Sequence, residues 1–189
     1  MNTPAHLLFG AALFARPSHP GTTVAAVLGA LVPDLSLYLM ATASIWLMGI
    51  PAERVFRELY FSTEWQAVFA VDNSIPLWGI VLAFALWRGR TAVIAFAAAG
   101  LLHVTCDLVL HNEDARRHFW PVSDWMFRSP VSYWDPRHHG QIVAPVEMAL
   151  AILCTAWLWR RFSGWRARAF FAALLALELT PHLMFHYLL

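Results

Sequence analysis

The stretch TAVIAFAAAGLLHVTCDLVL, residues Thr91–Leu110, decides the fold of this chain because it is an apolar run long enough to cross a bilayer as a helix. Near its end lies His103-Val-Thr-Cys-Asp107. Residues four apart lie on the same face of a helix, so an imidazole and a carboxylate are neighbours there. Both are ligands for zinc and similar divalent ions. Ionisable groups inside a membrane segment are costly, and they therefore indicate function.

The composition is typical of an integral membrane protein. Of the 189 residues, 59% are hydrophobic and 13% are charged, whereas charged residues make up about a quarter of a soluble domain. The mean hydropathy is +0.54. A net charge of +1 without any block of Lys and Arg argues against nucleic acid as a partner. Cys106 and Cys154 form no spacing motif, so we interpret them as small core residues.

The apolar pattern predicts an all-α, polytopic membrane bundle of five or six helices. The segments lie at about residues 3–15, 24–50, 67–87, 91–110, 143–159 and 169–189, separated by Gly, Pro and Arg. The first is short for a span, so we expect it to be re-entrant or tucked against its neighbours. No internal repeat divides the chain, and residues 1–189 are therefore expected to form a single integral membrane domain.

The arginines predict the orientation of the bundle. Two tight loops contain Arg88, Arg90 and the Arg160–Arg168 cluster, and short loops rich in Lys and Arg stay in the cytoplasm. Segments 51–66 and 111–142 then lie outside, where further arginines are accompanied by acidic residues.

The alternating path of the helices brings the unusual polar residues to one end of the bundle, opposite the arginine loops. These residues are His6, Asp34, Asp72, His103, Asp107, Glu147, His182 and His186. We expect Pro33 to break its helix and turn Asp34 toward the same pocket. The pattern predicts a polar His/Asp pocket under the Trp-rich loop that follows Leu110.

Within this pocket, the sequence favours some residues as the site. The predicted metal ligands are His6, Asp34, His103, Asp107 and His111, and Asp72 is the predicted catalytic residue, as general base or as a further ligand. His118, Asp124, Asp135, His138 and His139 are further candidates in the following loop. His182 and His186 carry weaker signals and are left out of the primary site.

Each candidate also has a purely structural interpretation. His103 and Asp107 could be a hydrogen-bonded pair that joins helices. Asp72 could cap the helix that begins near Pro76. His6 could be a buried core histidine in a helix that starts at Thr3 and Pro4. The loop tryptophans more often mark a membrane interface than a ligand cage.

Four short motifs occur in order along the chain. They are Thr3-Pro-Ala-His6, Pro33-Asp34, His103 to Asp107, and Phe119-Trp-Pro-Val-Ser-Asp124. In type and order they resemble the membrane-bound metal-dependent hydrolases of the bacterial inner membrane, known through LexA-regulated members. More distantly, the chain is similar to the all-helical zinc-dependent phospholipase C group. The resemblance runs from His6 to about Pro136.

The resemblance implies hydrolysis assisted by one or two divalent ions, with zinc as the first choice and manganese or iron as alternatives. It implies a lipid or lipid-linked phosphate ester as substrate, an inference by analogy of fold. It also implies the bacterial inner membrane as the location, and the arginine loops then place the pocket on the periplasmic side.

The chain also departs from the family pattern. After Pro-Asp the family usually continues to a second Asp and a His, whereas this chain has Leu35-Ser-Leu37. The family's Thr-His-Ser is replaced by Asp72-Asn-Ser74, and His111 stands where a small hydroxyl residue is common. The site is therefore either adapted to a different metal geometry or has lost catalysis while keeping the scaffold.

Two other classes of function fit parts of the sequence. A non-catalytic assembly factor, or a small subunit of a larger membrane complex, would use the Trp-rich loop 111–140 to contact a protein partner. A transporter or proton relay would also explain buried Asp and His, but the repeat that many transporters carry is absent from this sequence. Only the hydrolase is expected to contain bound metal in a stoichiometric amount, so a measurement of metal content distinguishes it from both alternatives.

Overall fold

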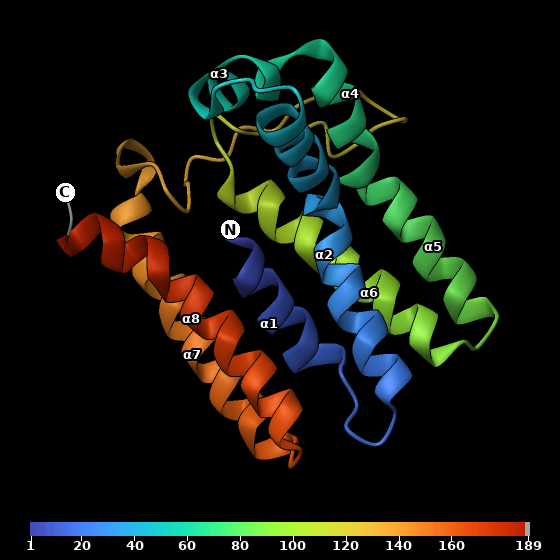
Figure 1. Cartoon of the computed structure of the whole chain (residues 1–189). Helices are drawn as coiled ribbons and strands as arrows, with labels where there is room; N and C mark the ends of the chain where they lie inside the picture. The colour runs from blue at the N-terminus through green and yellow to red at the C-terminus, as the bar shows by residue number, and fades with distance from the viewer. Residues whose placement is uncertain (188–189) are drawn as a thin grey trace.

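The computed structural model describes the backbone through Tyr187 and the side chains through Thr180, and this part of the chain is helical, as expected (Figure 1). The elements are α1 (Thr3–Phe14), α2 (Pro20–Thr42), η1 (Ala43–Leu47), α3 (Ala52–Arg57), η2 (Leu59–Phe61), α4 (Thr63–Asp72), α5 (Ile75–Trp87), α6 (Thr91–Leu110), η3 (Pro136–His138), α7 (Gly140–Arg161) and α8 (Trp165–Tyr187). The side chains of His182 and His186 lie outside the described residues.

Helices suited to crossing a membrane make up most of the described chain. The stretches that are long and apolar enough are Pro20–Leu47, Thr63–Trp87, Thr91–Leu110 and Gly140–Arg161. Large apolar side chains such as Leu39, Leu86 and Leu153 are exposed on them, as expected for surfaces that face lipid. The chain is therefore a membrane protein.

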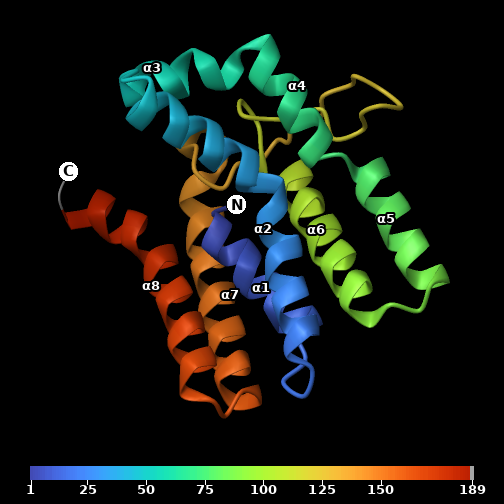
Figure 2. The same ribbon diagram turned by 45° about the vertical axis from the view of Figure 1, so that its right-hand side comes forward.

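Helix α1 lies at the centre of the bundle although it has only 12 residues. It packs against α2 and α6 on one side and against α7 and α8 on the other (Figures 1 and 2). Leu8 and Ala11 of α1 are fully buried in a core that also contains Leu158 and Phe171. Because longer helices surround it, α1 does not need the length of an ordinary span.

Helices α2 and α6 cross at very close range. A Cβ placed on Gly29 of α2 would lie 2.0 Å from the carbonyl oxygen of Phe96 in α6. Lipid offers no hydrophobic driving force between helices, so small residues that allow close packing stabilise such crossings. The contact fixes how the two helices that contain Asp34, His103 and Asp107 face each other.

The prediction that Pro33 breaks its helix is wrong, because α2 continues through it to Thr42. A proline weakens the local helical ladder, but neighbouring groups can pair with the freed carbonyls in a membrane helix. Here His103 Nδ1 donates to the carbonyl of Ala30 at 2.6 Å, and Asn73 Nδ2 donates to the carbonyl of Pro33 at 3.2 Å. The backbone carbonyls of α2 around Pro33 thus accept hydrogen bonds from two other parts of the chain.

The apolar run at 67–87, expected as one segment, is divided into α4 and α5. Ser74 caps α5, since its Oγ accepts a hydrogen bond from the Leu77 amide at 3.1 Å, and Pro76 lies in the first turn. Serine with a following proline is a strong helix start. The cap predicted in this region is therefore made by Ser74, two residues after Asp72.

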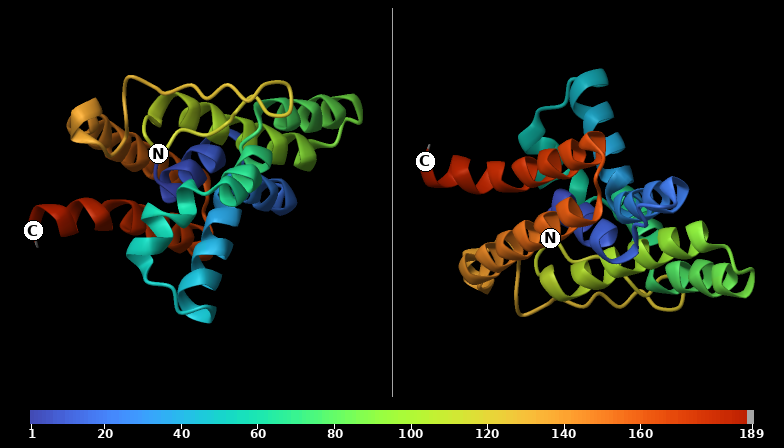
Figure 3. Two further views of the ribbon diagram at one scale, coloured as in Figure 1. Left: turned by 90° about the horizontal axis from the view of Figure 1, so that it is seen from above. Right: turned by 90° about the horizontal axis from the view of Figure 1, so that it is seen from below.

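A loop between α6 and α7, residues 111–139, reaches across to the joint of α4 and α5 and returns (Figure 3). His118 anchors it there, with its carbonyl accepting from the Ile75 amide at 2.8 Å. Ser74 Oγ also donates to the carbonyl of Trp120. The loop is thereby held over the end of the bundle where His103 and Asp107 lie.

Replacing Gly29 with alanine should destabilise the protein, because the added Cβ would overlap the Phe96 carbonyl. Overpacking of this kind costs ~1–3 kcal/mol, and thermal unfolding in detergent, followed by tryptophan fluorescence, should show a lower Tm. Gly79→Ala is the matched control, since nothing lies within 4 Å of its added Cβ. Equal effects of the two substitutions would contradict the close α2–α6 contact.

Candidate metal centre

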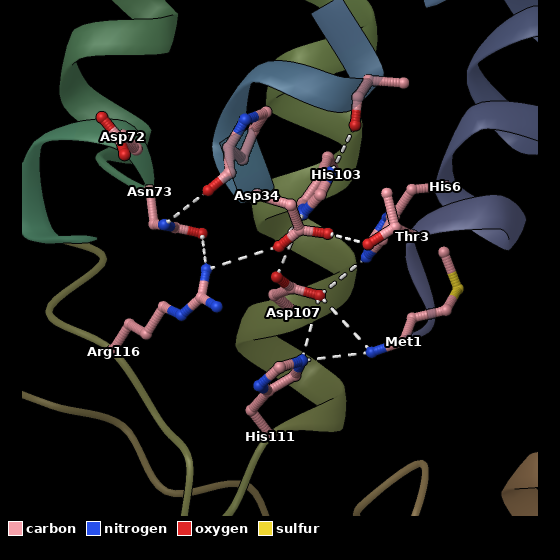
Figure 4. Close-up of polar contacts among 12 residues, drawn as sticks. Met1, Thr3, His6, Asp34, Asp72, Asn73, His103, Asp107, His111 and Arg116 are labelled. Atoms are coloured by element: carbon pink, nitrogen blue, oxygen red, sulfur yellow. Dashed lines mark hydrogen bonds and ion pairs between the residues drawn. The ribbon is translucent and has the colours of Figure 1, made fainter. Parts of the chain in front are cut away.

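Three buried side chains from α1 and α6 form the core of the candidate site. His6, His103 and Asp107 each offer one ligand atom, and these atoms all lie within 4.8 Å of one another (Figure 4). His6 Nε2 is 2.9 Å from Asp107 Oδ1, and His103 Nε2 is 3.2 Å from Asp107 Oδ2. Each residue is at most 2% exposed. The sequence-predicted pair in α6 therefore gains a third donor from α1.

The proton position on His103 follows from its backbone contact. The carbonyl of Ala30 can only accept, so Nδ1 of His103 is the donor in their 2.6 Å hydrogen bond. Nε2 is then left facing carboxylates, Asp107 at 3.2 Å and Asp34 Oδ1 at 3.6 Å. A neutral imidazole would point a lone pair at these oxygens, so the geometry requires a cation between them, either a proton or a metal ion. Carbonyl-held histidines of this kind are common metal ligands.

The rings of His6 and His103 stack on each other with centroids 3.4 Å apart and an interplanar angle of 3°. Two imidazolium rings at this distance would repel each other strongly, because the surroundings are buried and of low dielectric. The stacking therefore favours one shared cation at the Nε2 edge over two protonated histidines.

The three donors lie close enough together to converge on one small divalent ion, since one ligand atom from each lies within 4.8 Å of the others. Ligand atoms held about 2.0–2.2 Å from a tetrahedral zinc ion lie roughly 3.3–3.6 Å apart. His6 and His103 contact different oxygens of Asp107, at 2.9 and 3.2 Å, so these donors would have to move slightly apart to admit the ion. Two imidazoles and one carboxylate match catalytic zinc sites, which have three protein ligands and an open position.

Asp34 lies beside this group and is held by hydroxyl groups. Thr3 Oγ1 donates to Asp34 Oδ2 at 2.5 Å, and Tyr38 OH donates to Thr3 Oγ1 at 2.8 Å. Asp34 also lies 3.7 Å from the guanidinium of Arg116. Thr3 was not among the predicted site residues, because a threonine before a proline indicates the start of a helix and His6 was the ligand expected from its motif.

His111 completes the group at the end of α6. Its Nε2 lies 3.1 Å from Asp107 Oδ1 and its Nδ1 lies 3.0 Å from Asp114 Oδ2. The amino nitrogen of Met1 is also 3.1 Å from His111 Nε2. Burial lowers the pKa of His111, but the charge of Asp107 and the contact with Asp114 outweigh burial and raise the pKa above its ordinary value. His111 is thus bound tightly to the acidic residues around it.

The five predicted ligands are therefore brought together, whereas Asp72 is not part of their cluster. Asp72 ends α4, beyond Asn73 as seen from Asp34 (Figure 4). Its assignment as the catalytic residue stays a prediction. Glu147 lies at the same end of the bundle, where its Oε1 accepts from the Asn2 amide at 2.7 Å.

The other loop candidates make structural contacts among the described residues. Asp124 lies 3.1 Å from Arg117, and Asp135 lies 2.9 Å from Arg137. Trp125 and Trp134 of the loop are 59% and 50% exposed, in keeping with the interpretation of the loop tryptophans as interfacial residues.

A cavity of about 930 Å³ adjoins the cluster, and its lining as described includes Asp34 and His111 but not His6, His103 or Asp107. Asp34 and His111 contribute to its floor, together with Arg116, while Tyr38 and Leu177 lie on its walls. Arg116 is 2% exposed and was missed by the sequence analysis. Nothing in the sequence separates it from the neighbouring Arg117, because only the path of the loop decides which of the two points inward.

No family model, curated protein or solved structure matches this chain. The likeness to the inner-membrane hydrolases therefore rests on the four short motifs alone. The function has to be argued from the geometry of the site.

Acid should destabilise the loop through His118. Burial lowers its pKa to about 4, from about 6.5 in an unfolded chain. The folded protein then binds fewer protons than the unfolded one, so stability is lost as pH falls from about 6.5 toward about 4. Tm measured between about pH 7 and about pH 5 should fall less in His118→Asn than in the wild type. His19→Asn, at an exposed position, should retain the full pH dependence.

Proposed function

We propose that this protein is a membrane-embedded, metal-dependent hydrolase that acts on a lipid or lipid-linked phosphate ester. The proposal is carried by the convergence of His6, His103 and Asp107 within 4.8 Å of one another, beside a cavity of about 930 Å³ that is lined by their neighbours Asp34 and His111. Buried ionisable groups are expensive in a membrane protein and mark functional sites by default.

Zinc is the ion that we assign to the site, with manganese or iron as alternatives. Two imidazoles and a carboxylate are the donor set of several catalytic zinc sites, and borderline-soft nitrogen ligands favour zinc over magnesium or calcium. His111 lies beside the three core donors and is the residue that would complete the ligand set, while Asp34 lies on the side of the cavity. A bound divalent ion supplies a Lewis acid and makes water nucleophilic near neutral pH.

A general base must reach the attacking water from the cavity. Asp34 lines the cavity and lies 3.6 Å from His103 Nε2. Thr3 holds one of its oxygens, and the other faces the centre of the cluster. We therefore assign the proton-accepting role to Asp34 in preference to Asp72.

The position of the site at one end of the spans supports a substrate that comes from the bilayer. The arginine-rich loops Arg88–Arg90 and Arg160–Arg168 support placing the opposite end, with the cavity, on the periplasmic face of a bacterial inner membrane. A phosphate ester at the lipid surface would enter the cavity there.

Protein purified without chelators should contain about one or two divalent ions per chain by elemental mass spectrometry. His103→Ala and Asp107→Ala should lose the metal, because each removes one of three core ligands. His19→Ala is the matched control, since His19 is exposed and outside the cluster.

A wild-type protein that is folded but free of metal would contradict the hydrolase. The non-catalytic assembly factor, with loop 111–140 as its contact surface, would then be the better explanation.

Asp34→Asn should lower kcat for phosphate ester hydrolysis by at least about 100-fold while the metal content changes little, because a general base contributes roughly 10²–10⁴-fold. Asp124→Asn, an exposed position, should have no effect. If Asp72→Asn causes the loss and Asp34→Asn does not, the sequence-based assignment of Asp72 is right.

A further inference from the structure

The Arg116 side chain is a buried cation whose hydrogen-bonding capacity is only partly used. Nη1 donates to Asn73 Oδ1 at 2.8 Å, and the guanidinium lies over the ring of Phe69 at 4.9 Å from its centroid. Nε is buried and has no hydrogen-bond partner among the described residues. A guanidinium has five N–H donors in a planar fork, and leaving buried donors unpaired is costly. Tyr60 is a further hydrogen-bond partner of the guanidinium, and Nε is the donor that remains for a ligand.

A structural role as counter-ion to Asp34 explains Arg116 only in part. Nη1 lies 3.7 Å from Asp34 Oδ1, beyond hydrogen-bond distance, and this nitrogen is already used by Asn73. Burial lowers the pKa of Arg116, but Tyr60, Asp34 and Asp107 outweigh burial and keep the pKa above its ordinary value. The cavity therefore always contains this positive charge.

Arg116 is the positive charge of the cavity lining with which a phosphate can pair. The two nearby carboxylates of the lining already have partners, since Asp34 accepts from Thr3 and Asp114 pairs with His111. Guanidinium groups bind phosphate through two parallel hydrogen bonds, which a lysine cannot provide.

The walls of the cavity are apolar and come from separate elements. Leu37 of α2, Phe56 of α3 and Leu177 of α8 line it above the start of α1. Helix α1 packs between α2 and α8 and begins only at Thr3 (Figure 1). The space beyond its first turn is therefore flanked by two long helices, and it suits an alkyl chain beside a charged head group.

We propose that Arg116 is the phosphate-binding residue of this cavity and that Leu37, Phe56 and Leu177 hold the alkyl chain of the same molecule. The ligand is a phosphate that carries an alkyl chain, as in a phospholipid head group region. The inference rests on the proposed function for what happens after binding, but binding itself requires only Arg116 and the apolar wall.

Binding can be measured with a soluble probe, hexyl phosphate, by phosphorus NMR line broadening in a maltoside detergent that contains no phosphorus. Wild-type protein should bind hexyl phosphate at least about tenfold more tightly than inorganic phosphate, because the apolar wall would bury its five methylenes and terminal methyl group. Uncharged hexyl glucoside should not compete. Equal affinity for hexyl phosphate and inorganic phosphate would overturn the alkyl chain site.

Arg116→Gln should weaken hexyl phosphate binding by at least about tenfold, the usual loss for a charge-assisted hydrogen bond. Arg117→Gln is the matched control, because Arg117 is the next residue in the loop but pairs with Asp124 and the Gln66 carbonyl. It should change affinity less than about twofold. A folded Arg116→Gln protein with wild-type affinity would overturn the proposal.

Two further variants keep the test decisive if Arg116→Gln does not fold. Arg116→Lys retains the charge but loses the planar fork, so it should bind hexyl phosphate more weakly than the wild type. Leu177→Trp fills the exposed wall of the cavity and should reduce hexyl phosphate binding to the level of inorganic phosphate. Wild-type affinity in both variants would contradict the inference.

Repeating the titration after chelator treatment separates this inference from the proposed hydrolase. Binding of hexyl phosphate that depends on Arg116 in metal-free protein supports the phosphate site even if the metal assay fails. The opposite result is stoichiometric metal together with equal affinity of the wild type and Arg116→Gln for hexyl phosphate. It would support the hydrolase and contradict the proposed role of Arg116.

Discussion

The hydrogen bond from His103 Nδ1 to the carbonyl of Ala30 connects the two features on which the site depends, the α2–α6 crossing and the acidic cluster. Gly29 brings the two backbones close enough for this contact. With Nδ1 committed as donor, Nε2 is turned toward Asp34 and Asp107. The packing of two membrane helices thereby determines the chemistry of one imidazole.

Charge compensation is the second constraint on this end of the bundle. Asp34 and Asp107 are both buried, and a buried charge is tolerated only with partners. Those partners come from separate parts of the chain. They are histidines of α1 and α6, the hydroxyl of Thr3 and the guanidinium of Arg116. The same arrangement that lowers the cost of the carboxylates holds His6, His103 and Asp107 close enough together to bind a metal ion.

The loop 111–139 links this polar centre to the membrane surface. His118 and Trp120 attach it to the start of α5, so Arg116 is carried into the cavity while Trp125 and Trp134 remain exposed. One cavity is then lined by Asp34 and His111 of the candidate metal site, by Arg116 of the proposed phosphate site and by the apolar wall. A ligand that occupies all three has to be an amphiphile.

The sequence alone determined the helical membrane architecture, because runs of about 20 apolar residues in a bilayer have to satisfy their backbone groups internally. It also predicted the pair His103 and Asp107, since their contact is set by helical periodicity. Only tertiary structure decided three other features. They are the unbroken helix through Pro33, the division between α4 and α5 at Ser74, and the inward position of Arg116. These depend on partners distant in sequence: Asn73 and His103 for α2, Trp120 for α5, and Asn73 for Arg116. Local patterns contain no information on such contacts.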